Sequence, residues 1–335
     1  MDVLAAGPPL DEVLVDGRVL AGLARERVDR AGAVAADPRM QHLPGRRRVA
    51  RRLRRRRQCQ RRQAEQQRDA QRGGHGTFIG IGAAPVYPPS LVVDAGIHRM
   101  GRELVNWYLV EEAGKLTAVD AGLPAFADGL QSELDSAGLR LEDVEAVVLT
   151  HSDGDHTGLT PVFREAGARV LIHSDDEATL RRPGPKGGDG APIRLVPYMW
   201  RPAFWRFLGG MARRGGGRPP KIEGAETFAD GDVLDVPGRP RVVHAPGHTP
   251  GLSAFLFEDR GALFVGDALC TWNPLSGALG PQVMPKHFNV DYEQCFRSLK
   301  AFDPLTASTL LPGHGDPWEG SPAEAVRAAN AAGGR

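Results

Sequence analysis

Cysteine is scarce in this chain of 335 residues: it has three, far apart, at Cys59, Cys270 and Cys295. An odd, widely spaced set predicts neither a disulfide framework nor a paired-cysteine metal site, so we expect a reducing, cytoplasmic location. Long apolar runs are also absent, since no stretch approaches the ~18 apolar residues that a membrane-spanning helix needs. The first residues, MDVLAAGPPLDEVLVDG, carry acids where a secretory signal carries basic residues. We therefore expect no membrane partner.

The formal net charge is only +1, but the charges are unevenly distributed. Residues 1–93 carry 18 of the 42 Lys and Arg residues and 9 of the 41 Asp and Glu residues, which is a net +9. Residues 94–335 carry the remainder, a net −8. Because an acidic surface repels polyanions, we expect a small-molecule substrate and no nucleic acid for this part.

The first 93 residues differ in amino-acid composition from the rest. Residues 46–72 are almost all Arg and Gln and have no apolar stripe at helical spacing, so they cannot bury a face. Blocks of like charge are usually disordered. We expect residues 1–93 to be a disordered, dispensable extension, or upstream sequence that is no part of the native protein; a basic arm for nucleic acid is the alternative. Residues 94–335 are expected to form the folded domain.

Short apolar runs recur through residues 94–335 and are followed by helical patterns. The runs predict buried strands at 104–110, 115–120, 144–150, 169–173, 241–247, 253–258 and 262–269. Helices are expected after Pro124 and at 160–167, 292–302 and 321–332. Because the pattern occurs twice, it predicts an α/β fold of two sheets packed face to face, with helices outside. An insert rich in Gly, Pro and Arg, at about 182–221, separates the halves.

Seven His and Asp residues lie in four short stretches at the ends of apolar runs. They lie in HSDGDH (151–156), APGHTPG (245–251), FVGDAL (264–269) and LLPGHG (310–315). Any one of them alone is as well explained by a helix cap or a surface turn. Together, with Gly and Pro neighbours that let the backbone turn tightly, they predict convergence at one sheet edge. Imidazole and carboxylate are ligands of divalent metals, so the sequence predicts a metal site formed by His151, Asp153, Asp155, His156, His248, Asp267 and His314.

This combination resembles the metallo-β-lactamase superfamily. The matching stretches are VDAGLP (119–124), LTHSDGDHTG (149–158), APGHTPG (245–251), VGDAL (265–269) and PGHG (312–315). The resemblance implies a four-layer αββα sandwich with two divalent metal ions, zinc first among them. It implies one metal on His151, Asp153 and His248, a second on Asp155, His156 and His314, and Asp267 as the bridge. It also implies that Asp120 and Thr249 hold the ligand loops, although a plain turn role is the alternative for both.

One residue departs from the family pattern. The usual motif is HxHxDH, and Asp153 stands where the middle His is expected. A carboxylate adds negative charge to the first metal site and shifts its preference from zinc toward iron or manganese. The flavodiiron oxidoreductases of the superfamily carry a carboxylate at this place. A diiron-type oxidoreductase is therefore an alternative function.

The expected reaction is hydrolysis by a dinuclear metallo-hydrolase. Two metals can share a hydroxide that attacks an ester, thioester, lactone or related acyl bond, and Asp155 can orient that hydroxide and pass its proton to the leaving group. The sequence shows no serine nucleophile elbow, no Cys/His pair and no nucleotide-binding Gly-rich motif. A non-catalytic, metal-stabilised binding protein is a further alternative.

An aromatic segment inside the insert offers the best indication of the substrate. Residues 198–211 contain Tyr198, Trp200, Phe204 and Trp205, which we expect to form a lid that binds an apolar acyl group. The alternative is an interface with a second copy in a homodimer. His287, in MPKHFN, is a further candidate substrate contact, with a surface position as its alternative.

Overall fold

A computed structural model of the protein describes residues 91–94, 96–101, 104–184 and 198–333. All of these lie in the unit formed by residues 84–335. The expectations for the Arg/Gln-rich segment at 46–72 fall outside the described residues. The folded part begins earlier than the expected residue 94, because a strand at Leu91–Asp94 already pairs into the first sheet.

The first sheet has seven strands in sequence order, β1 to β7. They are β1 Leu91–Asp94, β2 Ile97–Met100, β3 Trp107–Glu112, β4 Lys115–Val119, β5 Val144–Val148, β6 Arg169–His173 and β7 Glu226–Phe228. The pairs from β1 to β4 are antiparallel, and those from β4 to β7 are parallel. The parallel half therefore directs the carboxyl ends of its strands to one edge.

The second sheet has five strands in the order β14-β13-β10-β9-β8. They are β8 Arg241–His244, β9 Ser253–Phe257, β10 Ala262–Gly266, β13 Thr309–Pro312 and β14 Trp318–Glu319. The β10–β13 pair is parallel and its neighbours are antiparallel. A separate two-stranded ribbon joins β11 Cys270–Trp272 to β12 Leu279–Gln282.

Three apolar clusters show that the layers run helix, sheet, sheet, helix. Along β3, Trp107 and Leu109 pack with the cluster that includes helix α3 (Ala127–Ala137) and helix α4 (Thr160–Glu165), whereas Tyr108 and Val110 pack between the two sheets. Because both faces of the strand are covered, it is a continuous apolar run and not an alternating one. The sequence-predicted four-layer α/β fold is confirmed.

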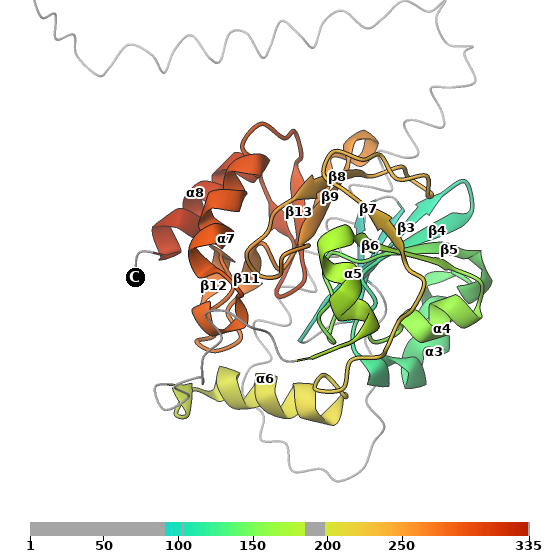
Figure 1. Ribbon diagram of the computed structural model, residues 1–335, viewed down its shortest axis with the longest axis horizontal. Helices are drawn as coiled ribbons and strands as arrows, with labels where there is room; N and C mark the ends of the chain where they lie inside the picture. The colour runs from blue at the N-terminus through green and yellow to red at the C-terminus, as the bar shows by residue number, and fades with distance from the viewer. Residues whose placement is uncertain (1–90, 95, 102–103, 185–197, 334–335) are drawn as a thin grey trace, which may run out of the picture. The chain divides into compact units, whose positions relative to one another are not determined.

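The helices of the outer layers divide between the two halves (Figure 1). Helices α3, α4 and α5 (Ser174–Arg181) lie by the first sheet, and α7 (Tyr292–Ser298) and α8 (Pro322–Gly333) lie by the second. Helix α6 (Pro202–Arg213) comes from the insert and lies below both groups in Figure 1, with Phe207 and Met211 packed against the first apolar cluster. Within the described ranges, no helix combines the length and apolarity needed to cross a membrane.

Candidate metal centre

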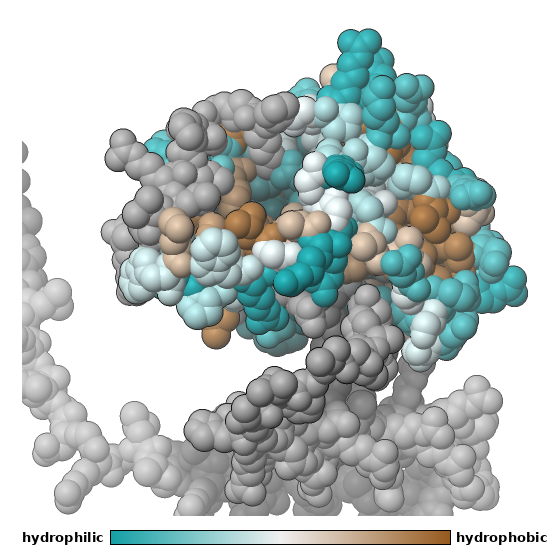
Figure 2. Space-filling model, turned by 90° about the horizontal axis from the view of Figure 1, so that it is seen from below, coloured by the Kyte–Doolittle hydropathy of each residue, from teal (hydrophilic) through white to brown (hydrophobic). Residues whose placement is uncertain are grey.

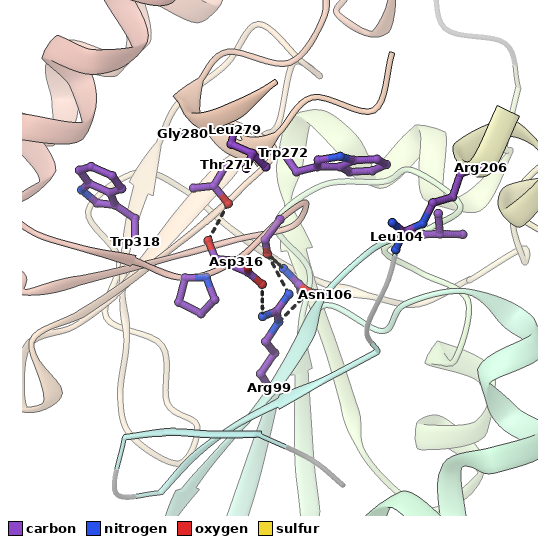
Figure 3. A pocket seen from close by; sticks show the side chains of 12 residues that line it. Arg99, Leu104, Asn106, Arg206, Thr271, Trp272, Leu279, Gly280, Asp316 and Trp318 are labelled. Carbon is purple, nitrogen blue, oxygen red and sulfur yellow. Dashed lines mark hydrogen bonds and ion pairs between the residues drawn. The ribbon is translucent and has the colours of Figure 1, made fainter. Parts of the chain in front are cut away.

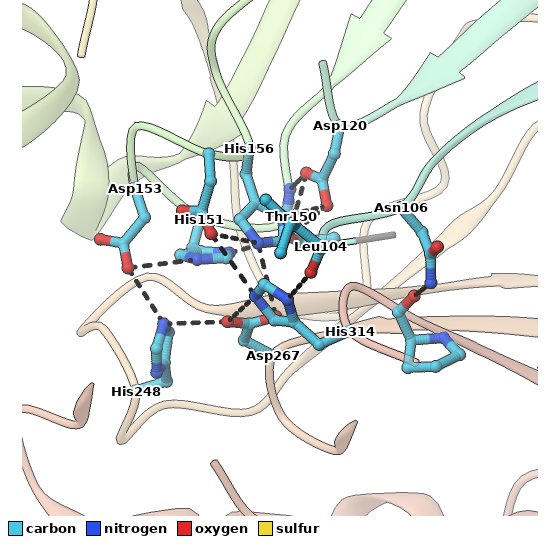
Figure 4. A network of polar contacts seen from close by, with 12 residues as sticks. Leu104, Asn106, Asp120, Thr150, His151, Asp153, His156, His248, Asp267 and His314 are labelled. Atoms are coloured by element: carbon cyan, nitrogen blue, oxygen red, sulfur yellow. Dashed lines mark hydrogen bonds and ion pairs between the residues drawn. The ribbon is translucent and has the colours of Figure 1, made fainter. Parts of the chain in front are cut away.

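Five loops meet at one edge of the two sheets, and each follows the carboxyl end of a strand. Asp120 follows β4, the HSDGDH loop follows β5, His248 follows β8, Asp267 follows β10 and His314 follows β13. In sheets of this kind, ligands bind outside the carboxyl ends of the strands. All seven predicted metal ligands are placed at this edge, and Figure 4 shows six of them around one point.

Asp120 connects two of the histidines. One of its carboxylate oxygens accepts hydrogen bonds from the Thr150 backbone N–H (2.7 Å) and hydroxyl (3.0 Å). The other accepts from His156 Nδ1 at 2.8 Å. The Thr150 hydroxyl also lies 2.9 Å from His151 Nδ1. Asp120 thereby orients both imidazoles so that their Nε2 atoms face the centre.

The other two histidines are held in the same way from different parts of the chain. His248 Nδ1 lies 3.0 Å from Asn289 Oδ1, and Asn289 is anchored by donating to the Met284 carbonyl at 2.9 Å. His314 Nδ1 donates to the Leu104 backbone carbonyl. Each histidine therefore has its Nδ1 occupied by the surrounding protein, which selects the tautomer whose Nε2 lone pair can bind a metal.

The first group of donors consists of His151, Asp153 and His248. Asp153 Oδ2 lies 3.5 Å from His151 Nε2 and 3.1 Å from His248 Nε2. The three donor atoms lie within 4.8 Å of one another. Asp153 therefore occupies, in space as well as in sequence, the place where the family pattern has a histidine.

The second group consists of Asp155, His156 and His314, with Asp267 beside both groups. Asp155 Oδ2 lies 3.5 Å from His314 Nε2 and 3.9 Å from His156 Nε2. One oxygen of Asp267 lies 3.4 Å from His156 Nε2, and the other lies 3.4 Å from both His248 Nε2 and His314 Nε2. Asp267 therefore contacts donors of both groups, as a bridging carboxylate would.

Three buried polar atoms at this point have no hydrogen-bond partner. They are Nε2 of His151, Nε2 of His156 and Oδ1 of Asp267. A buried polar atom left unpaired destabilises the folded state by about 1–3 kcal/mol, so such atoms rarely gather without a ligand. The donor set is nitrogen and oxygen, which suits zinc, iron and manganese. The residues therefore fit a metal centre, and the two groups fit a dinuclear one.

The carboxylates set the charge of the metal-free site. Burial alone would lower the pKa of His156, but the charges of Asp267, Asp120 and Asp155 outweigh burial and raise it to about 9. The pKa of His314 is likewise raised, against its burial, by Asp267 and Asp155. Protons on these imidazoles neutralise the acids when no metal is bound, and a metal must displace those protons to bind.

A cavity of about 400 Å³ opens onto these donors. Asp153, Asp155, His248, Asp267 and His314 form its floor. One wall is the inner face of α6, with Phe207, Leu208, Met211 and Ala212, and the other is formed by Met284, His287 and Phe288. The Phe207 ring lies 6.1 Å from the His314 ring, so α6 lies directly beside the second group of donors.

The four aromatic residues expected to form the lid do not line this cavity. Trp200 and Trp205 are 73% and 52% exposed, Phe204 is buried, and Tyr198 is half-buried just before the helix. The insert does form a wall of the cavity, but through residues farther along α6. Phe207, Leu208 and Met211 lie three, four and seven positions after Phe204, the spacing of one helical face. His287, in contrast, lines the cavity, and its Nδ1 is buried without a hydrogen-bond partner.

Two structural links were not apparent from the sequence. Asp176, on α5, is fully buried; it accepts hydrogen bonds from Ser152 N (3.0 Å) and Gly251 N (2.8 Å), and so joins the loops of His151 and His248. Asn289 holds His248 from 41 residues away. No local pattern marks either residue. The expected bracing by Thr249 is not made through its hydroxyl, which is buried without a hydrogen-bond partner.

A second cavity, of about 570 Å³, is lined by residues that directly follow His314, among them Asp316 (Figure 3). The Asn106 side chain in its wall donates to the carbonyls of Pro312 (2.9 Å) and Gly315 (2.6 Å), on either side of His314. Arg99 donates to Asn106 Oδ1 at 2.9 Å and to Asp316 at 2.8 Å. This network fixes the loop that carries His314.

Comparison with known proteins shows the superfamily to which this chain belongs. The family model described as the metallo-beta-lactamase superfamily matches residues 100–314. The chain is 29% identical over 233 residues to the protein named "Probable metallo-hydrolase YqjP" of Bacillus subtilis (strain 168), covering 63% of this chain and 66% of that protein. It is 26% identical over 165 residues to the "Atrochrysone carboxyl ACP thioesterase" of Aspergillus terreus, covering 48% of this chain and 38% of that protein.

A solved structure agrees in fold. It is that of a metallo-beta-lactamase family protein from Thermus thermophilus, which is 26% identical, with a TM-score of 0.50 over 69% of this chain and 76% of the other. The match to the family model covers more than half of the chain, and the buried His/Asp cluster lies at the sheet edge described above. The chain belongs to the metallo-beta-lactamase superfamily, and its buried His/Asp cluster fits a metal site.

Proposed function

We propose that the protein is a dinuclear metallo-hydrolase that cleaves an acyl bond in an ester, thioester or lactone. The observation that carries the proposal is the pair of donor groups that meet at Asp267, where three buried donor atoms have no hydrogen-bond partner. His151, Asp153 and His248 would hold one metal, and Asp155, His156 and His314 the other. Two bound divalent ions supply a water acidified to near neutral pH and polarisation of the acyl oxygen.

Asp155 is the residue we assign to proton movement. It lies on the floor of the cavity, where a substrate would enter. Burial alone would raise its pKa, but His156 and His314 outweigh burial and lower it, so the carboxylate is ionised at neutral pH. An ionised carboxylate there can orient the attacking water, accept its proton on the oxygen that does not hold the metal and deliver that proton to the leaving oxygen or sulfur.

The cavity walls favour an apolar acyl group. Phe207, Leu208, Met211, Met284 and Phe288 surround the approach to the donors, and the volume of about 400 Å³ suits a small molecule. His287 is placed among them with an unpartnered ring nitrogen, which suits it to bind a polar atom of the substrate. The thioesterase name of the fungal relative supports a thioester, although the match covers 38% of that protein.

The metal and the reaction class are tested together. Protein purified without added metal should contain two metal ions per chain by elemental analysis. Zinc is the metal we expect first, and the Asp153 carboxylate shifts the preference of its site toward iron or manganese. It should hydrolyse members of a panel of apolar esters, thioesters and lactones, and chelation should abolish that activity. Two iron ions per chain, together with electron-donor-dependent oxygen reduction and no hydrolysis, would support the diiron-type oxidoreductase that Asp153 suggests. Metal content without any turnover would support a binding protein.

A further inference from the structure

Helix α6 and the residues just before it expose large apolar side chains. We define the α6 surface as Met199, Trp200, Trp205 and Leu208, which are 50%, 73%, 52% and 44% exposed. Figure 2 views the molecule from the side on which α6 lies in Figure 1. Two tryptophans this exposed are unusual, because burying an aromatic ring is among the largest apolar contributions a side chain makes.

The charges of the segment that carries this surface are all of one sign. Residues 198–221 carry six basic side chains and no acid, in a part of the chain whose net charge is −8. The six are Arg201, Arg206, Arg213, Arg214, Arg218 and Lys221. Basic residues interleaved with exposed Trp and Leu on a helix are the pattern of segments that lie in the interface of an anionic lipid layer. Tryptophan itself prefers the headgroup region.

The same surface runs into the cavity above the metal ligands. Trp205, Leu208 and Ala212 lie at three- and four-residue spacing, so they form one stripe along α6. Leu208 and Ala212 also line the cavity, whereas Trp205 does not. An amphiphile held at the stripe would therefore have an apolar path to the donors.

A second copy of the chain fits this surface poorly. In a two-fold dimer the same patch meets itself, so six positive charges would face six positive charges with no acid from this segment between them. Like charges brought together in this way oppose association. An anionic partner removes that repulsion, and a lipid layer also accepts the exposed tryptophans without a preformed groove.

We propose that the α6 surface docks the protein onto an anionic lipid layer, with the mouth of the metal cavity at the lipid interface. This proposal stands whether or not the proposed hydrolase activity is correct, because it concerns where the domain binds. The tryptophans enter the headgroup region, and the arginines pair with lipid phosphates.

Tryptophan fluorescence of the full chain tests the proposal. Residues 1–93 contain no tryptophan, so the Arg/Gln-rich segment can bind vesicles without contributing to the signal. Vesicles of equimolar phosphatidylcholine and phosphatidylglycerol, with brominated acyl chains as quencher, should quench and blue-shift the emission. The doubly substituted Trp200→Phe/Trp205→Phe protein should lose most of that quenching, since Trp107 is buried and Trp272 and Trp318 are only partly exposed.

Charge variants separate this surface from general attraction to lipid. Arg206→Gln and Arg213→Gln should each weaken the quenching-detected affinity by about fivefold, because a basic residue near an anionic layer contributes about a factor of five. Arg206→Lys should keep the wild-type affinity. Arg327→Gln on α8, an exposed arginine outside the segment, is the matched control and should leave it unchanged.

Three outcomes would overturn the proposal. One is sedimentation with anionic vesicles without tryptophan quenching, which would assign lipid binding to residues 1–93. Another is equal quenching by neutral phosphatidylcholine vesicles. The third is a dimer in light scattering, or a complex with an acidic protein, that the Trp200→Phe/Trp205→Phe substitutions disrupt while vesicles give no quenching.

Discussion

Asp176 offers a test of how the metal centre is held together. Its carboxylate is fully buried and accepts hydrogen bonds from Ser152 N and Gly251 N, in the two loops that carry the first group of donors. Asp176→Asn keeps the size of the side chain but leaves one of the two N–H groups facing an amide NH2. We therefore expect the loss of one hydrogen bond to a charged acceptor, about 1.5–3 kcal/mol of unfolding free energy.

Urea unfolding measures this loss directly. With a denaturant slope of about 3 kcal/mol per molar, the midpoint of the metal-free protein should fall by about 0.5–1 M. Because the two loops are no longer tied together, metal affinity should fall by about 10- to 100-fold, as it does when other supports of metal ligands are removed. The metal content of the purified variant, measured by elemental analysis after dialysis, reports that second effect.

Asp175→Asn is the matched control. Asp175 is the adjacent acid on α5, its side chain is 55% exposed, and the substitution removes the same charge. It should leave both the urea midpoint and the metal content close to those of the wild type. If Asp176→Asn behaves like Asp175→Asn, the carboxylate does not couple the loops and the reasoning is refuted.

Three further predictions follow from the site. Asp153→Ala should leave at most one metal per chain by elemental analysis, and two metals in this variant would exclude Asp153 as a ligand. Asp153→His should retain zinc more firmly and move the pH–rate profile to lower pH. Phe207→Ala should raise KM for a soluble apolar substrate more than it lowers kcat, while Trp205→Ala should change neither, and the reverse result would restore the lid first expected. The metal-free protein should lose stability to urea as the pH rises from about 6.5 to 9. The pKa of His156 is raised to about 9 in the folded state, so protonated His156 stabilises the fold fully only below the pKa that it has in the unfolded chain. The metal-loaded protein should not show this loss, and a flat profile without metal would contradict the charge balance described.

The sequence by itself determined which loops carry the chemistry. His151, His248 and His314 each follow an apolar run; His248 and His314 stand beside Gly, and Gly154 lies within the loop of His151. These are local properties. A buried strand must be apolar, and the turn that ends it needs residues that tolerate tight backbone geometry. The strand, the turn and the ligand thus lie within a few neighbouring residues of the sequence. This is why the two-sheet fold and the convergence of the loops could be predicted.

The tertiary structure alone decided which residues support and surround that centre. Asn289 and Asp176 hydrogen-bond partners that are 41 and 24 residues away or farther. The spacing of residues within one helix or strand cannot predict such a pair. The same holds for α6, where the sequence showed an aromatic segment but neither that it is a helix nor which side would face the donors. Packing places Phe207 in the cavity and leaves Trp205 in solvent, because the side of a helix that is buried depends on the neighbour it meets and not on its composition.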